Sequence, residues 1–109
     1  MNIQFKKGVL ELCVLSLLAA EDRYGYDLAS HLSQSIDISD GTIYPILRRL
    51  KEEGYVTTYL QEASGGPPRK YYALTDSGRR EQRALRDEWV SFVYSVNGII
   101  QGGSDHEEN

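Results

Sequence analysis

The segment at residues 38–50, ISDGTIYPILRRL, limits the possible folds more than any other part of the chain. Its apolar side chains recur at helical spacing and would face a core, namely Ile43, Ile46, Leu47 and Leu50. The opposite side is small, hydroxyl-bearing and basic, with Gly41, Pro45 and Arg48 at its centre and Thr42, Tyr44 and Arg49 at its edges. Such a face suits the major groove of DNA, because short side chains allow close approach and arginines reach phosphates or guanine edges. An ordinary amphipathic helix with a solvated face fits this segment equally well.

The helix could begin at either of two residues, and the two choices differ in how much Pro45 would destabilise it. If Ser39 is the N-cap, Pro45 is the sixth helical residue. It then removes a backbone hydrogen bond and presses on the carbonyl of Gly41, at roughly 3 kcal/mol in a regular helix. If Thr42 is the N-cap, Pro45 falls in the first turn, where backbone N–H groups have no intrahelical partner anyway. The sequence leaves both starts open.

The rest of residues 1–75 predicts two helices before this segment and a hairpin after it. Residues 6–20 form an apolar helix and residues 24–33 a second one. Residues 55–61 and 69–75 are rich in β-branched and aromatic side chains, and the Gly- and Pro-rich stretch at 62–68 is a flexible loop between these strands. Three helices followed by a two-stranded wing is the order of a winged helix-turn-helix. We therefore predict a mostly helical α+β fold with a DNA-binding domain at residues 1–75.

Residues 76–100 predict a long last helix whose apolar side chains need a partner. Thr75 can cap its start. Its apolar residues step by 4, 3, 4 and 3 positions, the seam spacing of helices that pack on one another, and they are Leu85, Trp89, Phe92, Val96 and Ile99. Three small helices leave little surface to cover this seam, so we expect a second copy related by a two-fold axis to cover it. Residues 101–109 are Gly-rich and acidic, which predicts a disordered tail.

Charge and composition exclude several classes of protein. The net charge is −4, with eight Lys/Arg against nine Asp/Glu in residues 1–75 and four against seven in residues 76–109. Most of the net negative charge therefore lies outside the predicted DNA-binding domain. A single thiol, Cys13, fits a reducing cytoplasm, and no apolar run reaches the ~20 residues of a membrane span. The two histidines and the cysteine match no metal spacing or nucleophile–base pattern. We expect a cytoplasmic protein that is no enzyme and needs no catalytic residue, metal, cofactor or membrane.

Four blocks of sequence resemble the PadR family of bacterial transcriptional regulators. They are GVLELCVLSLL in the first helix, YGYDLASHL in the second, SDGTIYPILRRLKEEGYV at the third helix, and GPPRKYYALTDSGRR at the exit of the wing. Each block alone is weak, but their order and spacing over most of residues 8–80 make the match strong. The single helix after the wing is similar to that of the family's short members.

The resemblance implies a dimeric repressor that binds a pseudo-palindromic operator in double-stranded DNA. The third helices would contact two half-sites about one DNA turn apart, and the last helices would form the homodimer. The family's DNA-contacting positions correspond here to Ser39, Thr42, Tyr44, Arg48, Arg69, Lys70 and Tyr71. We add Arg49, from the helix edge, and Lys6 and Lys7, whose charge suits phosphate contacts. Family wings often carry a further basic residue near the tip, where this chain has Pro67 and Pro68, so we expect modest affinity and a shallow salt slope.

The family often responds to small aromatic or drug-like effectors, which directs attention to the single tryptophan. Near a two-fold axis, Trp89 and its mate, with Phe92 beside them, could stack on a flat apolar molecule and release the repressor. Alternatively, Trp89 is only a large packing residue of the dimer. A second function also stays open: a winged helix that binds a protein rather than DNA, which the negative net charge favours and the basic residues of the third helix and wing oppose.

Overall fold

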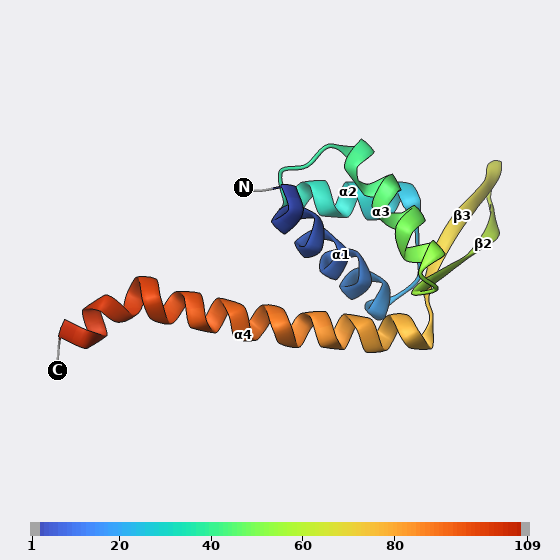
Figure 1. The fold of residues 1–109 in the computed structure, drawn as a ribbon. Helices are drawn as coiled ribbons and strands as arrows, with labels where there is room; N and C mark the ends of the chain where they lie inside the picture. The colour runs from blue at the N-terminus through green and yellow to red at the C-terminus, as the bar shows by residue number, and fades with distance from the viewer. Residues whose placement is uncertain (1–2, 108–109) are drawn as a thin grey trace.

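The structure, a computed structural model, describes the backbone of residues 3–107 and the side chains of residues 8–39 and 41–102. Helices α1 (Ile3–Ala20), α2 (Gly25–Ser35) and α3 (Asp40–Glu52) form a bundle, and α4 (Asp76–Glu107) runs below it and projects far beyond it (Figure 1). Strands β1 (Arg23–Tyr24), β2 (Val56–Ala63) and β3 (Gly66–Leu74) form an antiparallel sheet in the order β1-β3-β2. This arrangement confirms the predicted winged helix followed by a long helix.

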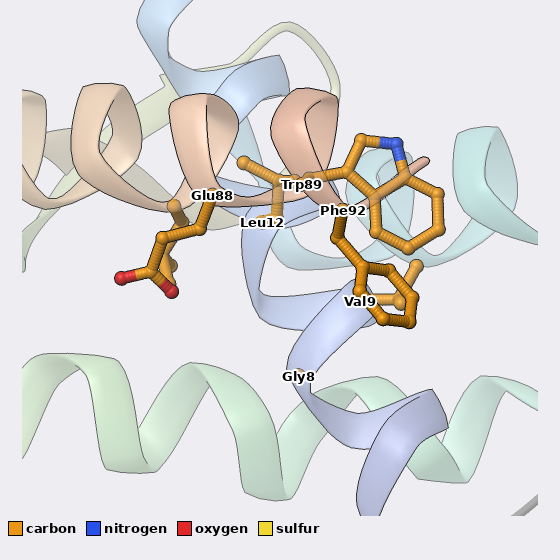
Figure 2. Close-up of a pocket in the computed structure, with 7 residues that line it drawn as sticks. Gly8, Val9, Leu12, Glu88, Trp89 and Phe92 are labelled. Carbon is orange, nitrogen blue, oxygen red and sulfur yellow. The ribbon is translucent and has the colours of Figure 1, made fainter. Parts of the chain in front are cut away.

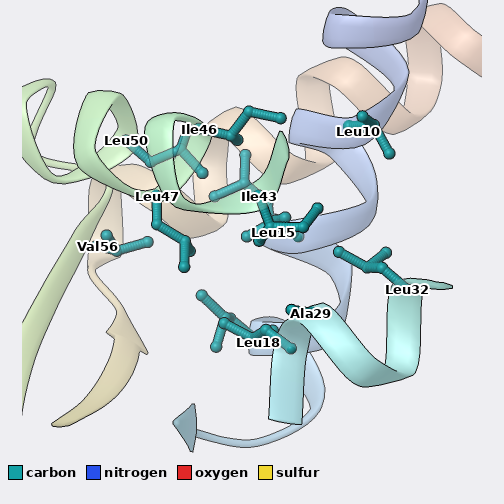
Figure 3. Packing of buried hydrophobic residues seen from close by; sticks show 12 residues of the cluster. Leu10, Leu15, Leu18, Ala29, Leu32, Ile43, Ile46, Leu47, Leu50 and Val56 are labelled. Atoms are coloured by element: carbon teal, nitrogen blue, oxygen red, sulfur yellow. The ribbon is translucent and has the colours of Figure 1, made fainter. Parts of the chain in front are cut away.

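The core lies between α1, α2 and α3 and is closed by β2. The predicted inward face of α3 is buried against side chains of α1 and α2 (Figure 3). The buried cluster consists of Leu10, Val14, Leu15, Leu18, Leu28, Ala29, Leu32, Ile43, Ile46, Leu47, Leu50 and Val56. Cys13 is half-buried at its edge, and burial raises the pKa of its thiol. Because one face of α3 is fixed in this core, its other face is held outward in a defined orientation.

The first turn of α3 resolves the choice between the two predicted starts. The helix begins at Asp40 with Ser39 as the residue before it, so Pro45 lies inside the helix. Ser39 makes no side-chain capping hydrogen bond; its hydroxyl lies 3.1 Å from that of Thr42, and its carbonyl accepts the N–H of Thr42 at 3.0 Å. The helix ends just before Gly54, a residue type typical of helix ends, which adopts φ +81°, a left-handed conformation that terminates helices.

The end of α3 and the start of α4 meet at one corner of the molecule. The carbonyl of Gly54 accepts hydrogen bonds from the hydroxyls of Thr75 (2.7 Å) and Ser77 (3.0 Å), and the N–H of Thr75 donates to the carbonyl of Tyr55 at 3.1 Å. Thr75 also accepts the N–H of Gly78 at 3.0 Å, which confirms it as the cap of α4. We call this cluster, Gly54, Tyr55, Thr75, Ser77 and Gly78, the corner joint.

The hairpin is tighter than predicted. The strands continue until Ala63 pairs with Gly66, and Ser64 and Gly65 alone separate them; Gly65 adopts φ +75°. The predicted flexible loop at residues 62–68 is therefore mostly strand. Pro67 and Pro68 are tolerated because the register between β2 and β3 shifts there, and prolines lack only the ladder N–H that such an irregularity leaves unused.

Two further differences concern the ends of elements. Residues 23 and 24, predicted as a connection and a helix start, form the short strand β1 and add a third strand to the predicted two-stranded wing. Helix α4 continues to Glu107, so the disordered tail predicted from residue 101 is helical as far as the structure describes it. Glycines lower helix propensity by about 1 kcal/mol without forbidding a helix. None of the described helices is both long and apolar enough to cross a membrane.

Candidate nucleic-acid interface

The outward face of α3 presents hydroxyl-bearing and basic side chains, as predicted. Ser39 just before the helix, Tyr44 at one edge of the outward face and Arg48 at its centre are exposed, whereas Thr42 at the other edge is half-buried. Arg48 has no ion-pair partner among the residues whose side chains are described. A short hydroxyl side chain at each end of the first turn lets the helix approach a surface closely, while Arg48 extends one turn further along.

A groove separates this face from the wing. It consists of two hollows of about 340 and 290 Å³ that share Tyr44, Lys70 and Tyr72 in their walls and therefore adjoin each other. We call it the wing groove; its other walls are Tyr24, Gly25, Tyr26, Leu47, Arg48, Lys51 and Arg69. Its cations are Arg48 and Lys51 from α3 and Arg69 and Lys70 from β3, and none of the described residues that line it is acidic. In a chain of net charge −4 this is a marked segregation of positive charge.

Arg49 differs from its neighbour Arg48. Its guanidinium forms an ion pair with the carboxylate of Glu11 on α1, whose side chain is 13% exposed. The hydrogen bond to Glu11 raises the pKa of Arg49 above its ordinary value. Arg49 was predicted to contact DNA with Arg48, but the structure directs its charge to the bundle instead of the wing groove. We therefore leave it out of the candidate interface.

Three tyrosines lie side by side across the sheet. Tyr71 of β3 pairs in register with Tyr24 of β1 on one side and with Tyr59 of β2 on the other. The ring centroids are 5.7 Å apart for Tyr24 and Tyr71 and 5.6 Å apart for Tyr59 and Tyr71. The hydroxyl of Tyr59 donates to Asp22 at 2.8 Å, and this hydrogen bond raises the pKa of the phenol. We call Tyr24, Tyr71 and Tyr59 the tyrosine row.

Two of the predicted DNA contacts, Tyr71 and Arg69, are in contact with the tyrosine row. Tyr71 is half-buried in the middle of the row, whereas Arg69 is exposed and places its guanidinium carbon 4.7 Å from the centre of the Tyr24 ring. Lys70, between them in sequence, lines the wing groove. Lys6 and Lys7 lie in α1, but the structure describes only their backbone and not their side chains.

Six residues of the wing groove were not among the predicted DNA contacts: Tyr24, Gly25, Tyr26, Leu47, Lys51 and Tyr72. Tyr24 and Tyr26 lie at the start of the predicted second helix, where large aromatic residues favour an interpretation as packing residues, yet Tyr26 is 63% exposed. A signal existed for Lys51, because it follows Arg48 by three positions and therefore shares its helix face. No local signal existed for Tyr72, which reaches the groove through the pairing of distant strands.

A second hollow lies between α1 and α4, away from the wing. It measures about 490 Å³ and is walled by Gly8, Val9 and Leu12 of α1 and by Leu85, Glu88, Trp89 and Phe92 of α4 (Figure 2). The rings of Trp89 and Phe92 have centroids 6.4 Å apart, and Trp89 remains 36% exposed. This hollow falls within the size range of small-molecule sites.

The predicted seam of α4 divides into two parts. Leu85 packs against the core of its own protomer, so it differs from the expectation that it serves a partner copy. Beyond it Phe92 and Ile99 are exposed, the latter by 78%, and Val96 is half-buried. Further exposed apolar side chains of the same helix are Val90, Tyr94 and Ile100. Since this part of α4 projects beyond the bundle, the protomer itself does not cover it (Figure 1).

Comparison with known proteins gives consistent matches. Residues 14–84 match the family described as transcriptional regulator PadR-like. The negative transcriptional regulator PadR of Bacillus subtilis is 32% identical over 82% of this chain and 57% of its own length. The transcriptional regulator YqjI of Escherichia coli is 37% identical over 79% of this chain, which spans 44% of that relative. The crystal structure of a PadR-like transcriptional regulator from Bacillus cereus superposes with a TM-score of 0.82 and 37% identity, covering 90% of this chain and 97% of the other.

Proposed function

The chain belongs to the PadR-like family of transcriptional regulators, a non-enzymatic class, and we propose that it is a dimeric, sequence-specific repressor that binds operator DNA. Residues 1–75 serve as the DNA-binding unit, and residues 76–100 pair two copies. A regulator of this kind acts in the cytoplasm, where bacterial operator DNA lies.

The observation that carries this proposal is the wing groove with its four cations and no carboxylate among its described walls. Phosphate groups supply most of the nonspecific affinity of a DNA-binding protein, and lysine and arginine are their usual partners. Helix α3 enters the major groove, where Arg48 contacts a phosphate, Tyr44 meets a base edge, and Ser39 and Thr42 allow close approach. The wing, through Arg69 and Lys70, contacts the flanking backbone.

Dimerisation follows from the exposed apolar part of α4. The proposed dimer packs Trp89, Phe92, Val96 and Ile99 of two copies against each other and presents both α3 helices to the same DNA duplex. A two-fold protein fits a pseudo-palindromic operator with half-sites about one DNA turn apart. This proposal explains why apolar side chains remain exposed on a helix that a single protomer leaves bare.

The two neighbouring arginines test DNA binding with a built-in control. In Arg48→Ala, we expect the slope of log K against log salt to become shallower by about 0.9, because one phosphate contact is lost. In Arg49→Ala the slope should stay unchanged while the melting temperature falls, because this arginine pairs with Glu11. Fluorescence anisotropy titrations, with a duplex from the chain's own upstream region and a scrambled duplex, give both quantities at several salt concentrations.

The same titration separates the repressor from a winged helix that binds a protein. A repressor prefers one duplex and weakens as salt rises. Absence of salt-sensitive binding to the upstream duplex, the scrambled duplex and pooled genomic fragments would contradict DNA binding and favour the protein partner. Equal changes of the salt slope in the Arg48 and Arg49 variants would contradict the assignment of Arg48 alone to the interface.

We further propose that a small aromatic effector occupies the hollow beside Trp89 and Phe92. Because Trp89 is the single tryptophan, its fluorescence should be quenched by p-coumaric acid or acridine if either stacks on it. Release of labelled duplex by the same compound, measured relative to each protein's own affinity without the compound, should be lost in Trp89→Leu. A Trp89→Leu protein that still releases DNA as readily would leave Trp89 as a packing residue only.

A further inference from the structure

We propose that Tyr24 is a positioning residue for Arg69: its ring holds the guanidinium ready for a DNA phosphate before the wing meets DNA. This inference rests on the proposed function, since it concerns how a cation of the wing groove is presented. It assigns a role in DNA binding to a side chain of β1, a strand that sequence analysis did not anticipate.

The first step is the contact between the two side chains. The guanidinium carbon of Arg69 lies 4.7 Å from the centre of the Tyr24 ring, within the range of a cation–π interaction. Arg69 itself is exposed and forms no ion pair among the residues whose side chains are described. The ring of Tyr24 is therefore the feature of the structure that favours one orientation of this long, flexible side chain.

The second step is the rigidity of the ring. Tyr24 is half-buried and contacts two further rings, Tyr71 at 5.7 Å and Tyr26 at 6.3 Å. Tyr71 contacts Tyr59, whose hydroxyl is fixed by Asp22 just before β1. The tyrosine row thus spans all three strands, and its last member, Tyr59, is hydrogen-bonded to the segment just before β1, the strand that carries Tyr24. Tyr24 is held by backbone pairing with Tyr71 as well as by ring contacts, so it offers Arg69 a stable platform.

The third step is the energetic consequence for binding. An exposed arginine side chain loses rotamer freedom when it binds a phosphate, and ordering such a side chain lowers affinity by about two- to tenfold. A guanidinium already stacked on an aromatic ring has lost much of that freedom beforehand. Pre-ordering raises affinity without adding a phosphate contact, so it should leave the salt slope unchanged.

The experiment is a double-mutant cycle on the full chain, read by anisotropy titration at several salt concentrations. Tyr24→Leu should weaken DNA binding about three- to tenfold with an unchanged salt slope, and Tyr24→Phe should bind like the unmodified protein. Arg69→Ala should weaken binding and make the slope shallower by about 0.9. In the Arg69→Ala background, Tyr24→Leu should have almost no further effect.

A second variant covers the case in which Tyr24→Leu does not fold. Arg69→Lys keeps the charge but stacks poorly on a ring. Its affinity for DNA should therefore fall about three- to tenfold, while its salt slope should equal that of the unmodified protein. Tyr94→Leu, an exposed tyrosine on α4, is the control for loss of a ring elsewhere.

The outcomes distinguish the inference from the function on which it rests. Equal losses from Tyr24→Leu with and without Arg69, or a shallower slope in Tyr24→Leu, would mean that Tyr24 only supports the wing and would overturn the inference alone. Unmodified affinity in Arg69→Lys would overturn it as well. No change of affinity or slope in Arg69→Ala would overturn both the inference and the assignment of Arg69 to the DNA interface.

Discussion

Gly78→Ala should destabilise the protein by about 3 kcal/mol, one of the two largest effects that we expect from a small change to this chain. Gly78 is buried at the corner joint, and an added Cβ would overlap the carbonyl oxygen of Tyr55 and lie 2.8 Å from Cδ1 of Leu74. The obstacle is backbone rather than the end of a flexible side chain, so it cannot move aside without breaking the hydrogen bond between Thr75 and Tyr55. Urea denaturation followed by circular dichroism gives the free energy of unfolding.

Gly98→Ala is the matched control for this prediction. Gly98 lies in the same helix on the side away from the seam, and nothing lies within 4 Å of an added Cβ. Replacing a glycine in a helix interior by alanine should therefore stabilise the protein by about 0.5–1 kcal/mol. If Gly78→Ala and Gly98→Ala change stability in the same direction, the corner joint is not packed as the structure describes it.

The corner joint also matters for function, because it connects the two units that the proposed repressor must coordinate. Glu53 alone separates the end of α3 from Gly54 and Tyr55, while Thr75 caps α4 and Ser77 lies in its first turn. A change in how two α4 helices pack would therefore reach α3 through a few hydrogen bonds rather than through a flexible linker. These hydrogen bonds would connect the proposed effector hollow on α4 with the proposed DNA interface on α3.

The parts of the fold that were predictable depend on local periodicity. Ile43, Leu47 and Leu50 recur every three or four residues, and that spacing alone specifies a helix with one buried face. Gly54 and Thr75 mark a helix end and a helix start through their own backbone and side-chain chemistry. These features need no knowledge of distant residues, which is why sequence analysis found them.

The parts that were missed depend on contacts between distant segments. Strand β1 has two residues, too few for any alternating pattern, and exists because Tyr24 pairs with Tyr71. Arg48 and Arg49 are identical in type and adjacent, and only the fold places Glu11 of α1 beside Arg49. Leu85 fits the seam spacing of α4, but it is half-buried and packs against the core of the bundle, which lies beside this part of the helix.

The second large effect concerns the dimer. Val96→Asp combined with Ile99→Asp should convert the protein to a monomer and weaken operator binding by about 100-fold or more. Each aspartate would have to enter an apolar interface without a partner charge, which is strongly unfavourable. A monomer contacts one half-site at a time and loses the effective concentration that links the second half-site to the first, a factor of about 10² to 10⁴. Sedimentation velocity gives the oligomeric state, and anisotropy titration gives the affinity.

The control adds the same two charges to the same helix on the side away from the seam. Ser91→Asp combined with Asn97→Asp changes exposed residues of α4 and should leave both the dimer and the operator affinity close to those of the unmodified protein. A dimer that survives Val96→Asp with Ile99→Asp would place the interface elsewhere on the chain. A monomeric variant that keeps full operator affinity would mean that one protomer suffices for recognition, and the two-fold operator model would then be wrong. The wing groove and the α4 seam thus make separate predictions, one about salt dependence and one about assembly, and each can fail without the other.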